Sequence, residues 1–248
     1  MKHHRYKYAP ITEAIIDFRV ELAPDYPVER LKKVNEGLES NYPNVNDLYE
    51  NVGQMQFGPH PSVEARSKHS GFLFANSENT LLYQSRINGF TTSHLAPYEN
   101  WNSFQTVARS LWELYRSQTK PSKITRLAVR YINRIDIPLP LRNFEDYLRT
   151  FLTLSPELPQ EINRFFINLL LPLDEINGYV QINETIMEPS NPNVVSIVLD
   201  IDVFRTNDVP TDENSIWNLF EVLHHAKNDV FEACITDNAR ELFVICDT

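Results

Sequence analysis

The sequence predicts an α+β fold, with a mainly antiparallel sheet and long helices packed on one of its faces. Segments with the two-residue alternation of strands follow one another without helices between them. Two long helical periodicities, at 97–118 and 211–235, each come after such a run of strands. Consecutive strands interrupted by single helices are typical of antiparallel pairing, because every parallel pair needs a long crossover connection.

A chain of 248 residues is long enough for one large domain or for two closely packed halves. We predict a single α+β domain over residues 1–248. The order of the elements further suggests two related halves, about 8–118 and 122–235, each with strands followed by one long helix. This repeat lies in the order of elements and carries no clear sequence identity.

The first half begins with a strand and a helix. In AIIDFRVEL (14–22), apolar residues alternate with Asp17, Arg19 and Glu21, which predicts a half-buried strand. The segment PVERLKKVNEGLES (27–40) has apolar residues at helical spacing after an initial proline, which suits the first turn of a helix.

Residues 53–95 lack helical periodicity and predict a run of short strands. These strands are expected near 54–58, 62–67, 71–75, 80–87 and 89–95. Asn88-Gly89 between the last two is the strongest local hairpin signal. The helix over 97–118 follows, with aromatic and aliphatic residues at spacings of three and four.

The second half begins with RLAVRYINRIDI (126–137), which predicts a strand that ends before two prolines. A short helix is expected over 143–152. The remaining elements are three strands and a long final helix, expected at 164–173, 178–187, 193–204 and 211–235. Acidic residues occupy the first turn of that final helix, where the helix dipole favours them.

Charge and composition argue against several classes of protein. The chain has 33 acidic and 23 basic residues, and a formal charge of −10 disfavours non-specific binding to a nucleic-acid backbone. It has no apolar run near the roughly 20 residues of a membrane helix, and no signal-peptide core. Its two cysteines cannot make a disulfide framework. Dinucleotide, Walker and zinc motifs are absent from the sequence. We therefore expect a cytoplasmic protein without a membrane segment, and the sequence leaves any cofactor open.

Three arginines lie on one face of the predicted strand over 126–137. Arg126, Arg130 and Arg134 are four residues apart and form a spaced basic row, because alternate strand residues share a face. A planar guanidinium can donate two hydrogen bonds to one carboxylate or phosphate. The row therefore predicts either an anion-binding face or cross-strand pairs with acidic residues. The acidic candidates are Asp17, Glu21, Glu184, Asp200 and Asp202.

Three further residues are candidates for a ligand site. Asn133 lies on the apolar face of the same strand and needs a partner, either a loop backbone or a ligand, because an unpaired buried amide is costly. Tyr98 and Trp101 open the helix over 97–118, where they line the mouth of a pocket or pack in the core.

Asp200 and Asp202 point the same way from one predicted strand, a spacing that can hold a divalent metal. The sequence supplies no third ligand and no phosphate-binding partner, so polar outer-face aspartates are the competing interpretation. His224 borders the apolar stripe of the final helix, as a packed histidine or as a base.

Several stretches together resemble one protein family. They are PITEAIIDF, LAPYENWNSF, RYINRIDIP, LDIDVF and FEACIT, and the resemblance covers nearly the whole chain. The family consists of sporadically distributed bacterial and archaeal proteins of about this length, without an established activity. The positions that the resemblance marks in this chain are Glu13, Tyr98, Trp101, Arg130, Tyr131, Asn133, Arg134, Asp202 and His224. Because such a distribution is typical of mobile and defence-linked genes, the resemblance implies phage defence or toxin control by analogy.

The leading hypothesis is a binding or regulatory module whose polar sheet face recognises an anionic partner. Arg130 and Arg134 would contact the anion, and Asn133 would organise the site from behind. Tyr98, Trp101 and Glu13 complete the candidate ligand-binding set. The partner is left open between a nucleotide-like small molecule, an RNA end and an acidic protein segment.

Two alternatives belong to other classes. The first is a metal-dependent phosphoryl-transfer enzyme or phosphodiester hydrolase that uses Asp200 and Asp202, with His224 assisting. The second is an acidic, antitoxin-like protein whose charge of −10 meets a basic protein partner. The sequence leaves open whether the chain is an enzyme and whether it forms a homo-oligomer.

Overall fold

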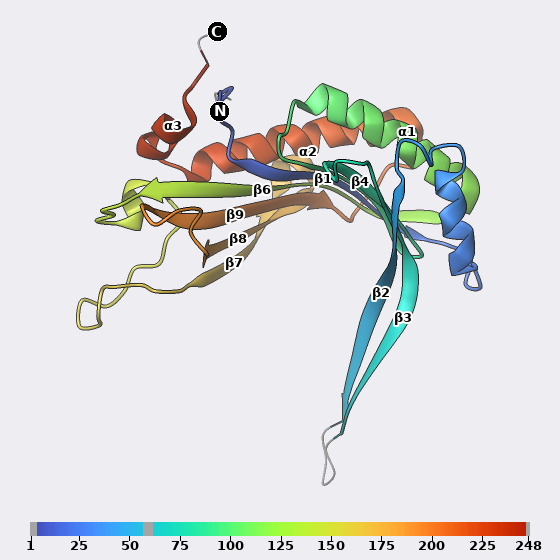
Figure 1. Cartoon of the computed structure of the whole chain (residues 1–248), viewed down its shortest axis with the longest axis horizontal. Coiled ribbons are helices and arrows are strands. Elements are labelled where there is room, and N and C mark those ends of the chain that lie inside the picture. Colours follow the sequence, from blue (N-terminus) through green and yellow to red (C-terminus); the bar gives the residue numbers. More distant parts are fainter. Residues whose placement is uncertain (1–3, 57–61, 247–248) are drawn as a thin grey trace. The chain divides into compact units, whose positions relative to one another are not determined.

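The computed structural model describes residues 4–56 and 62–246, with side chains described outside residues 52–66. Nine strands form an antiparallel sheet in the order β2-β3-β4-β5-β1-β6-β9-β8-β7, and helices accompany it (Figure 1). The predicted α+β class with an antiparallel sheet is therefore confirmed. No helix within the described ranges is long and apolar enough to cross a membrane.

The chain divides into two compact units, and each is described by itself. Unit 1 consists of Met1–Ile15, Leu95–Tyr98 and Leu127–Thr248, and unit 2 of Ile16–His94 and Glu99–Arg126. Both units are built from stretches that are separated along the chain. The expected division into halves at 8–118 and 122–235 stays a prediction.

Unit 2 holds the later part of β1 (Ile11–Glu21), the start of β6 (Lys123–Pro138) and the strands between them. Those strands are β2 (Asn44–Gln56), β3 (Ser62–Ala75), β4 (Leu81–Arg86) and β5 (Gly89–Leu95). β2 and β3 form a long two-stranded ribbon that extends away from the helix α1 (Trp101–Thr119) (Figure 1).

The core of unit 2 lies between its sheet and α1. The Asn100 side chain caps this helix by accepting a hydrogen bond from the Ser103 amide at 2.9 Å. The ring of Trp112 in α1 stacks on Phe18 of β1 with centroids 3.8 Å apart. Because side chains alternate along a strand, Asp17 and Arg19 lie on the sheet face opposite Phe18.

Two local predictions for unit 2 need correction, and a third lies partly outside the described residues. The α-helix expected over 27–40 is a 3-10 helix, η1 (Val28–Asn35), and Gly37 with a φ of +83° follows it. The β4–β5 turn consists of Ile87 and Asn88, since Arg86 pairs with Gly89. The hairpin was therefore expected one residue too late. Of the strand expected near 54–58, the part up to Gln56 belongs to β2, and residues 57 and 58 lie outside the described residues.

Unit 1 holds the early part of β1, most of β6, and the strands β7 (Phe166–Leu173), β8 (Gly178–Met187) and β9 (Val194–Arg205). The strands β6 and β9 pair antiparallel, with Arg130 opposite Asp202. The 22-residue helix α2 (Glu213–Cys234) begins at Asp212, whose side chain accepts from the Ser215 amide at 3.0 Å.

Helix α2 packs on the face of β6 that carries Tyr131. The Tyr131 ring lies 6.1 Å from the His224 ring and 3.6 Å from the Lys227 Nζ atom. Because Arg130 and Arg134 alternate with Tyr131, they lie on the other face of the strand. The expected arrangement of apolar and polar faces on this strand is thus present within unit 1.

Two predictions near the C-terminus also need correction. The helix expected over 143–152 is only the 3-10 turn η2 (Phe144–Asp146), because Leu148 forms a β-bridge with Ile235. A short helix, α3 (Asp237–Phe243), was not predicted. Its cap is Thr236, whose hydroxyl oxygen accepts from the Ala239 amide at 3.4 Å.

Candidate functional site

The structure pairs Arg130, the first expected anion contact, with a carboxylate. Its Nε and Nη2 atoms donate to Oδ1 and Oδ2 of Asp200, each at 2.7 Å. The hydrogen bonds that Arg130 donates to Asp200 are the main cause that raises the pKa of Arg130, and the charges of Asp200, Asp202 and Glu13 add to it. The surroundings of Arg130 are therefore acidic, because Asp202 and Glu13 act on it in addition to its direct partner Asp200.

Arg134, the second expected anion contact, is also engaged. Its Nε donates to Asp136 at 3.0 Å, and its Nη2 donates to the Ser196 hydroxyl at 2.9 Å. Burial acts to raise the pKa of Asp136, but hydrogen bonds from Ser196, Ser190 and Arg134 outweigh it and lower that pKa. The guanidinium of Arg134 is therefore part of a local polar network on the face of unit 1.

Asn133 has a structural partner. This residue is 2% exposed, and its Nδ2 atom donates to the backbone oxygen of Leu199 at 3.0 Å. Leu199 is the residue directly opposite on β9, so the amide is satisfied within the sheet. The partner is therefore the backbone of a neighbouring strand, where a loop backbone or a ligand was expected.

The two expected aromatic residues fall in different units. The Tyr98 hydroxyl lies 2.7 Å from the Tyr131 hydroxyl in unit 1. Trp101 is the first residue of α1 in unit 2, where it is buried beside Phe104. Burial of Trp101 agrees with the core interpretation, and a ligand-lining role for either ring stays a prediction.

Within the described part of the chain, Asp200 and Asp202 do not belong to a group of side chains that could hold a metal ion. Both carboxylate oxygens of Asp200 accept from Arg130, and Oδ2 also accepts from the Asn183 amide at 3.0 Å. Among the residues that the structure describes, no group of three His, Cys, Asp or Glu side chains is placed to hold a metal ion.

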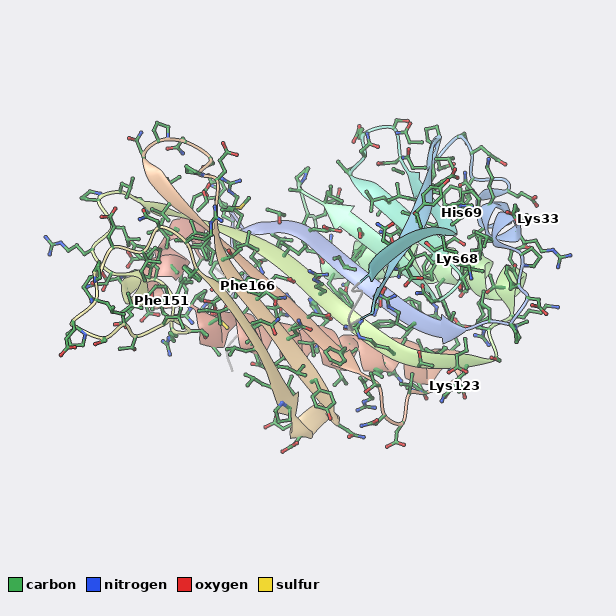
Figure 2. The ribbon with its side chains drawn as sticks, turned by 90° about the horizontal axis from the view of Figure 1, so that it is seen from below. Lys33, Lys68, His69, Lys123, Phe151 and Phe166 are labelled. Carbon is green, nitrogen blue, oxygen red and sulfur yellow. The ribbon has the colours of Figure 1, made fainter. Side chains whose placement is uncertain are left out.

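Two buried ionisable residues of unit 1 were not expected as site candidates. Lys227 is 6% exposed, and burial lowers its pKa to about 7. Its Nζ atom donates to Asn228 Oδ1 at 2.5 Å. Glu184 is fully buried, and its carboxylate has no hydrogen-bond partner among the described residues. Burial raises the pKa of Glu184 to about 8. Figure 2 shows unit 1 and unit 2 with their side chains.

Unit 2 contains a cluster in which several guanidiniums share one carboxylate. We call it the Asp17 cluster: Asp17, Arg19, Arg86, Thr91 and Arg126. Asp17 is 6% exposed. Its Oδ1 accepts from Arg86 Nη2 at 3.0 Å, and its Oδ2 accepts from Arg126 Nη1 at 3.0 Å and from Arg19 Nε at 3.2 Å.

Thr91 links two members of the Asp17 cluster. Its hydroxyl donates to Asp17 Oδ1 at 2.6 Å and accepts from Arg86 Nη2 at 2.6 Å. Burial lowers the pKa of Arg86, the Asp17 charge acts against this, and the Arg19 charge lowers the pKa further. The Nε atom of Arg86 is buried without a hydrogen-bond partner in the described part of the chain. The cluster therefore brings three guanidiniums to one buried carboxylate.

Strand geometry brings this cluster together. Asp17 and Arg19 alternate with the buried Phe18 on β1, and Arg86 reaches them from the end of β4. Gly89 makes this approach feasible, because a Cβ there would lie 2.4 Å from the Phe18 carbonyl oxygen and 3.3 Å from Arg86 Nη2. The close packing of β5 against β1 thus depends on a residue without a side chain.

Sequence reasoning identified only part of the Asp17 cluster. Arg126 belonged to the predicted basic row, and Asp17 was one of its candidate partners, so that pair agrees with the cross-strand interpretation. Arg19 was placed on a polar strand face but was not selected, and Arg86 was missed. The useful signal was the placement of Arg19, Arg126 and Asp17 on polar strand faces. The order of the strands in the sheet brings these residues together, and local sequence patterns do not predict that order.

Comparisons with known proteins do not extend this picture: neither the models of protein families nor the curated proteins include a match to this sequence. The resemblance to the sporadically distributed family therefore stays a prediction, and the function has to be argued from the geometry.

Proposed function

We propose that the protein is a binding or regulatory module that recognises an oxyanion through the Asp17 cluster on the polar face of its sheet. The observation that carries this proposal is the sharing of one buried carboxylate by three guanidiniums. The ligand group is a phosphate or a carboxylate, both of which match the planar donor pattern of arginine.

Charge counting supports an anion at this place. Arg19 and Arg86 both bond to Asp17, and one carboxylate offsets only one of these two charges. This excess exists even when the charge of Arg126 is left out of the count. Because Arg86 is largely buried, its charge is poorly screened by water, so an arriving anion would gain more there than at an exposed arginine.

The proposal moves the expected site from unit 1 to unit 2. Arg130 has its own bidentate carboxylate and further acids nearby, so an added anion would meet repulsion there. Arg19 has 41% of its side chain exposed, which allows it to reach a ligand while it remains bonded to Asp17. We further propose that the protein works in the cytoplasm. We also propose that long helices pack on the sheet face opposite the polar face.

The enzyme alternative has less support than the binding module. Asp200 is committed to Arg130 and Asn183, and the described residues supply no third metal ligand. The acidic-partner alternative rests on the charge of −10 alone. Neither alternative explains why three arginines of unit 2 converge on one aspartate.

A thermal-shift titration with inorganic phosphate, pyrophosphate, ATP and citrate tests the proposal. A ligand at 100 times its Kd adds about 2.7 kcal/mol of stability, which is readily measured. We expect the wild-type chain to be stabilised by at least one of these anions at low salt, and the shift to shrink as salt is added.

The variant Arg19→Ala and its control Arg130→Ala decide where the anion binds. The two guanidiniums are matched, because both side chains are 41% exposed, lie on strands and bond to a buried aspartate. We expect Arg19→Ala to abolish the shift and Arg130→Ala to keep it. Loss only in Arg130→Ala would place the site in unit 1, and the absence of any shift in the wild-type chain would refute anion binding by this protein.

A further inference from the structure

The strand β7 forms one end of the sheet and carries no charged residue. It is the last strand in the hydrogen-bonded order, and its sequence is FINLLLPL. Three of its apolar side chains are strongly exposed, with Phe166 at 68%, Leu170 at 59% and Leu171 at 43% (Figure 2 labels Phe166). An edge strand of this kind is a template for another strand, and proteins usually protect such edges with charges.

Two of these side chains are arranged on one side of β7. Phe166 lies opposite Thr185 and Leu170 lies opposite Gln181 of β8, with Asn168 midway between them. Residues two and four apart share a face of a strand, so Phe166, Asn168 and Leu170 form a short row. The order of the row is apolar, polar, apolar from either end. Two antiparallel copies of the row can therefore pair with apolar residues facing apolar residues and the polar residues facing each other.

We propose that β7 pairs antiparallel with β7 of a second copy of this chain, about a two-fold axis at Asn168. In this register, Phe166 of each copy faces Leu170 of the other, and the two Asn168 amides face each other. Cross-strand pairs of aromatic with aliphatic residues and of amide with amide are favourable. A two-fold axis uses the same surface on both copies, as closed dimers require.

Charges at the ends of β7 favour the same occupant. Arg164 precedes the strand and Asp174 follows it, and both are exposed. In the proposed register, Arg164 lies opposite Pro172 of the second copy and diagonal to its Asp174, within reach of a long side chain. The chain as a whole carries −10, so two copies repel over most surfaces. In the proposed dimer the two copies meet at β7, which carries no charge itself and is flanked by the positive Arg164 and the negative Asp174.

The proposed contact is small, which makes the dimer dependent on concentration. Pro172 has no amide hydrogen, so the central residues from Phe166 to Leu170 provide most of the backbone pairing. A stable interface usually buries about 800 Å² on each partner, more than one strand edge offers. We expect a dissociation constant in the range of roughly 10 µM.

Sedimentation velocity of the full chain from about 1 to 100 µM tests the dimer, a range that brackets the expected dissociation constant. The dimer fraction should rise with concentration in the wild-type chain. It should be lost in Leu170→Lys, which brings a charge to the contact. Leu158→Lys is the matched control, because Leu158 lies in a loop of unit 1 and is 55% exposed. The control should dimerise like the wild-type chain.

Cross-linking tests the register independently. In a Cys246→Ser background, Asn168→Cys should give a disulfide-linked dimer on oxidation, because residues on the axis are close enough for a disulfide. Leu158→Cys should not. A chain that stays monomeric at every concentration, or equal behaviour of the Leu170→Lys and Leu158→Lys variants, would overturn the proposal and leave the β7 edge to a different partner. Circular dichroism confirms that each variant is folded.

Discussion

At the scale of single residues, the main result is that the arginines on polar strand faces have different surroundings in the two units. Arg130 and Arg134 each bond to a carboxylate of their own, whereas Arg19, Arg86 and Arg126 converge on Asp17. The value of an arginine for binding depends on the charge left after its protein partners are counted. Spacing along one strand cannot supply that count.

Glu184 gives a residue-scale prediction about pH. Its pKa is about 8 in the folded chain and ordinary in the unfolded chain, so the folded state holds the proton more tightly. Its contribution to stability is therefore fully present below the unfolded pKa and is lost as pH rises through about 8. We expect Glu184→Gln to increase the unfolding free energy by about 1–3 kcal/mol at pH 8 and to change it little at pH 4.5.

Urea denaturation of the wild-type chain and of Glu184→Gln between pH 4.5 and 8.5 measures the difference in their unfolding free energies. The variant Glu188→Gln is a suitable control, since Glu188 is an exposed acid just beyond the same strand. A difference between wild type and Glu184→Gln that does not change with pH would contradict the assignment of a raised pKa to Glu184.

Lys227 gives a prediction with the opposite slope. Its folded pKa of about 7 lies below its unfolded value, so the folded state releases the proton more easily. The buried ammonium lowers stability most at pH 7 and below, and this penalty fades as pH rises toward the unfolded pKa. We expect Lys227→Met to stabilise the chain at pH 6 by about 1–2 kcal/mol, and the gain to shrink by pH 9.

The contact of Lys227 with the Tyr131 ring opposes this gain, because a cation over a ring is favourable. Urea denaturation of Lys227→Met at pH 6 and pH 9 gives both values, and the exposed-lysine variant Lys120→Met serves as control. A variant that is less stable than wild type at pH 6 would show that the ring contact outweighs the cost of burying the ammonium.

At the scale of elements, Gly89 controls how closely β5 approaches β1. We expect Gly89→Ala to lower the unfolding free energy by about 1–3 kcal/mol, because its Cβ would lie 2.4 Å from the Phe18 carbonyl oxygen. Gly37→Ala is the comparison: a Cβ there meets nothing within 4 Å, and only its φ of +83° disfavours alanine. Thermal denaturation of both variants measures the costs, and equal costs would mean that the sheet yields readily at Gly89.

The elements also show what sequence patterns can and cannot predict. Strands with one buried face were placed well, and β8 has the predicted bounds. Helix α2 lies inside its predicted range, and α1 ends one residue beyond the range predicted for it. The part of β2 from Asn44 to Asn51 was missed, because nearly all of its side chains are exposed and no alternation marks it. Its strand conformation comes from pairing with β3, and the sequence of β2 alone does not predict this pairing.

At the scale of the whole molecule, the candidate site was the least predictable feature. Asp17 and Arg86 are 69 residues apart in the chain, and they meet only because β4, β5 and β1 are neighbours in the sheet. Local alternation told which residues share a face, but it gave neither the strand order nor the register. A polar face with arginines could therefore be predicted from the sequence, while the convergence of Arg19, Arg86 and Arg126 on Asp17 could not.

The two proposals for this molecule involve different units, which allows a final prediction. The Asp17 cluster belongs to unit 2 and β7 to unit 1, and they share no residue. Substitutions without shared partners usually act independently. We therefore expect Leu170→Lys to remove the dimer while keeping the anion-dependent thermal shift, and Arg19→Ala to remove the shift while keeping the dimer. Measuring sedimentation and thermal shift on both variants separates the outcomes. Loss of both properties in Leu170→Lys would mean that the anion site depends on the dimer, and loss of both in Arg19→Ala would mean that the dimer depends on the anion site.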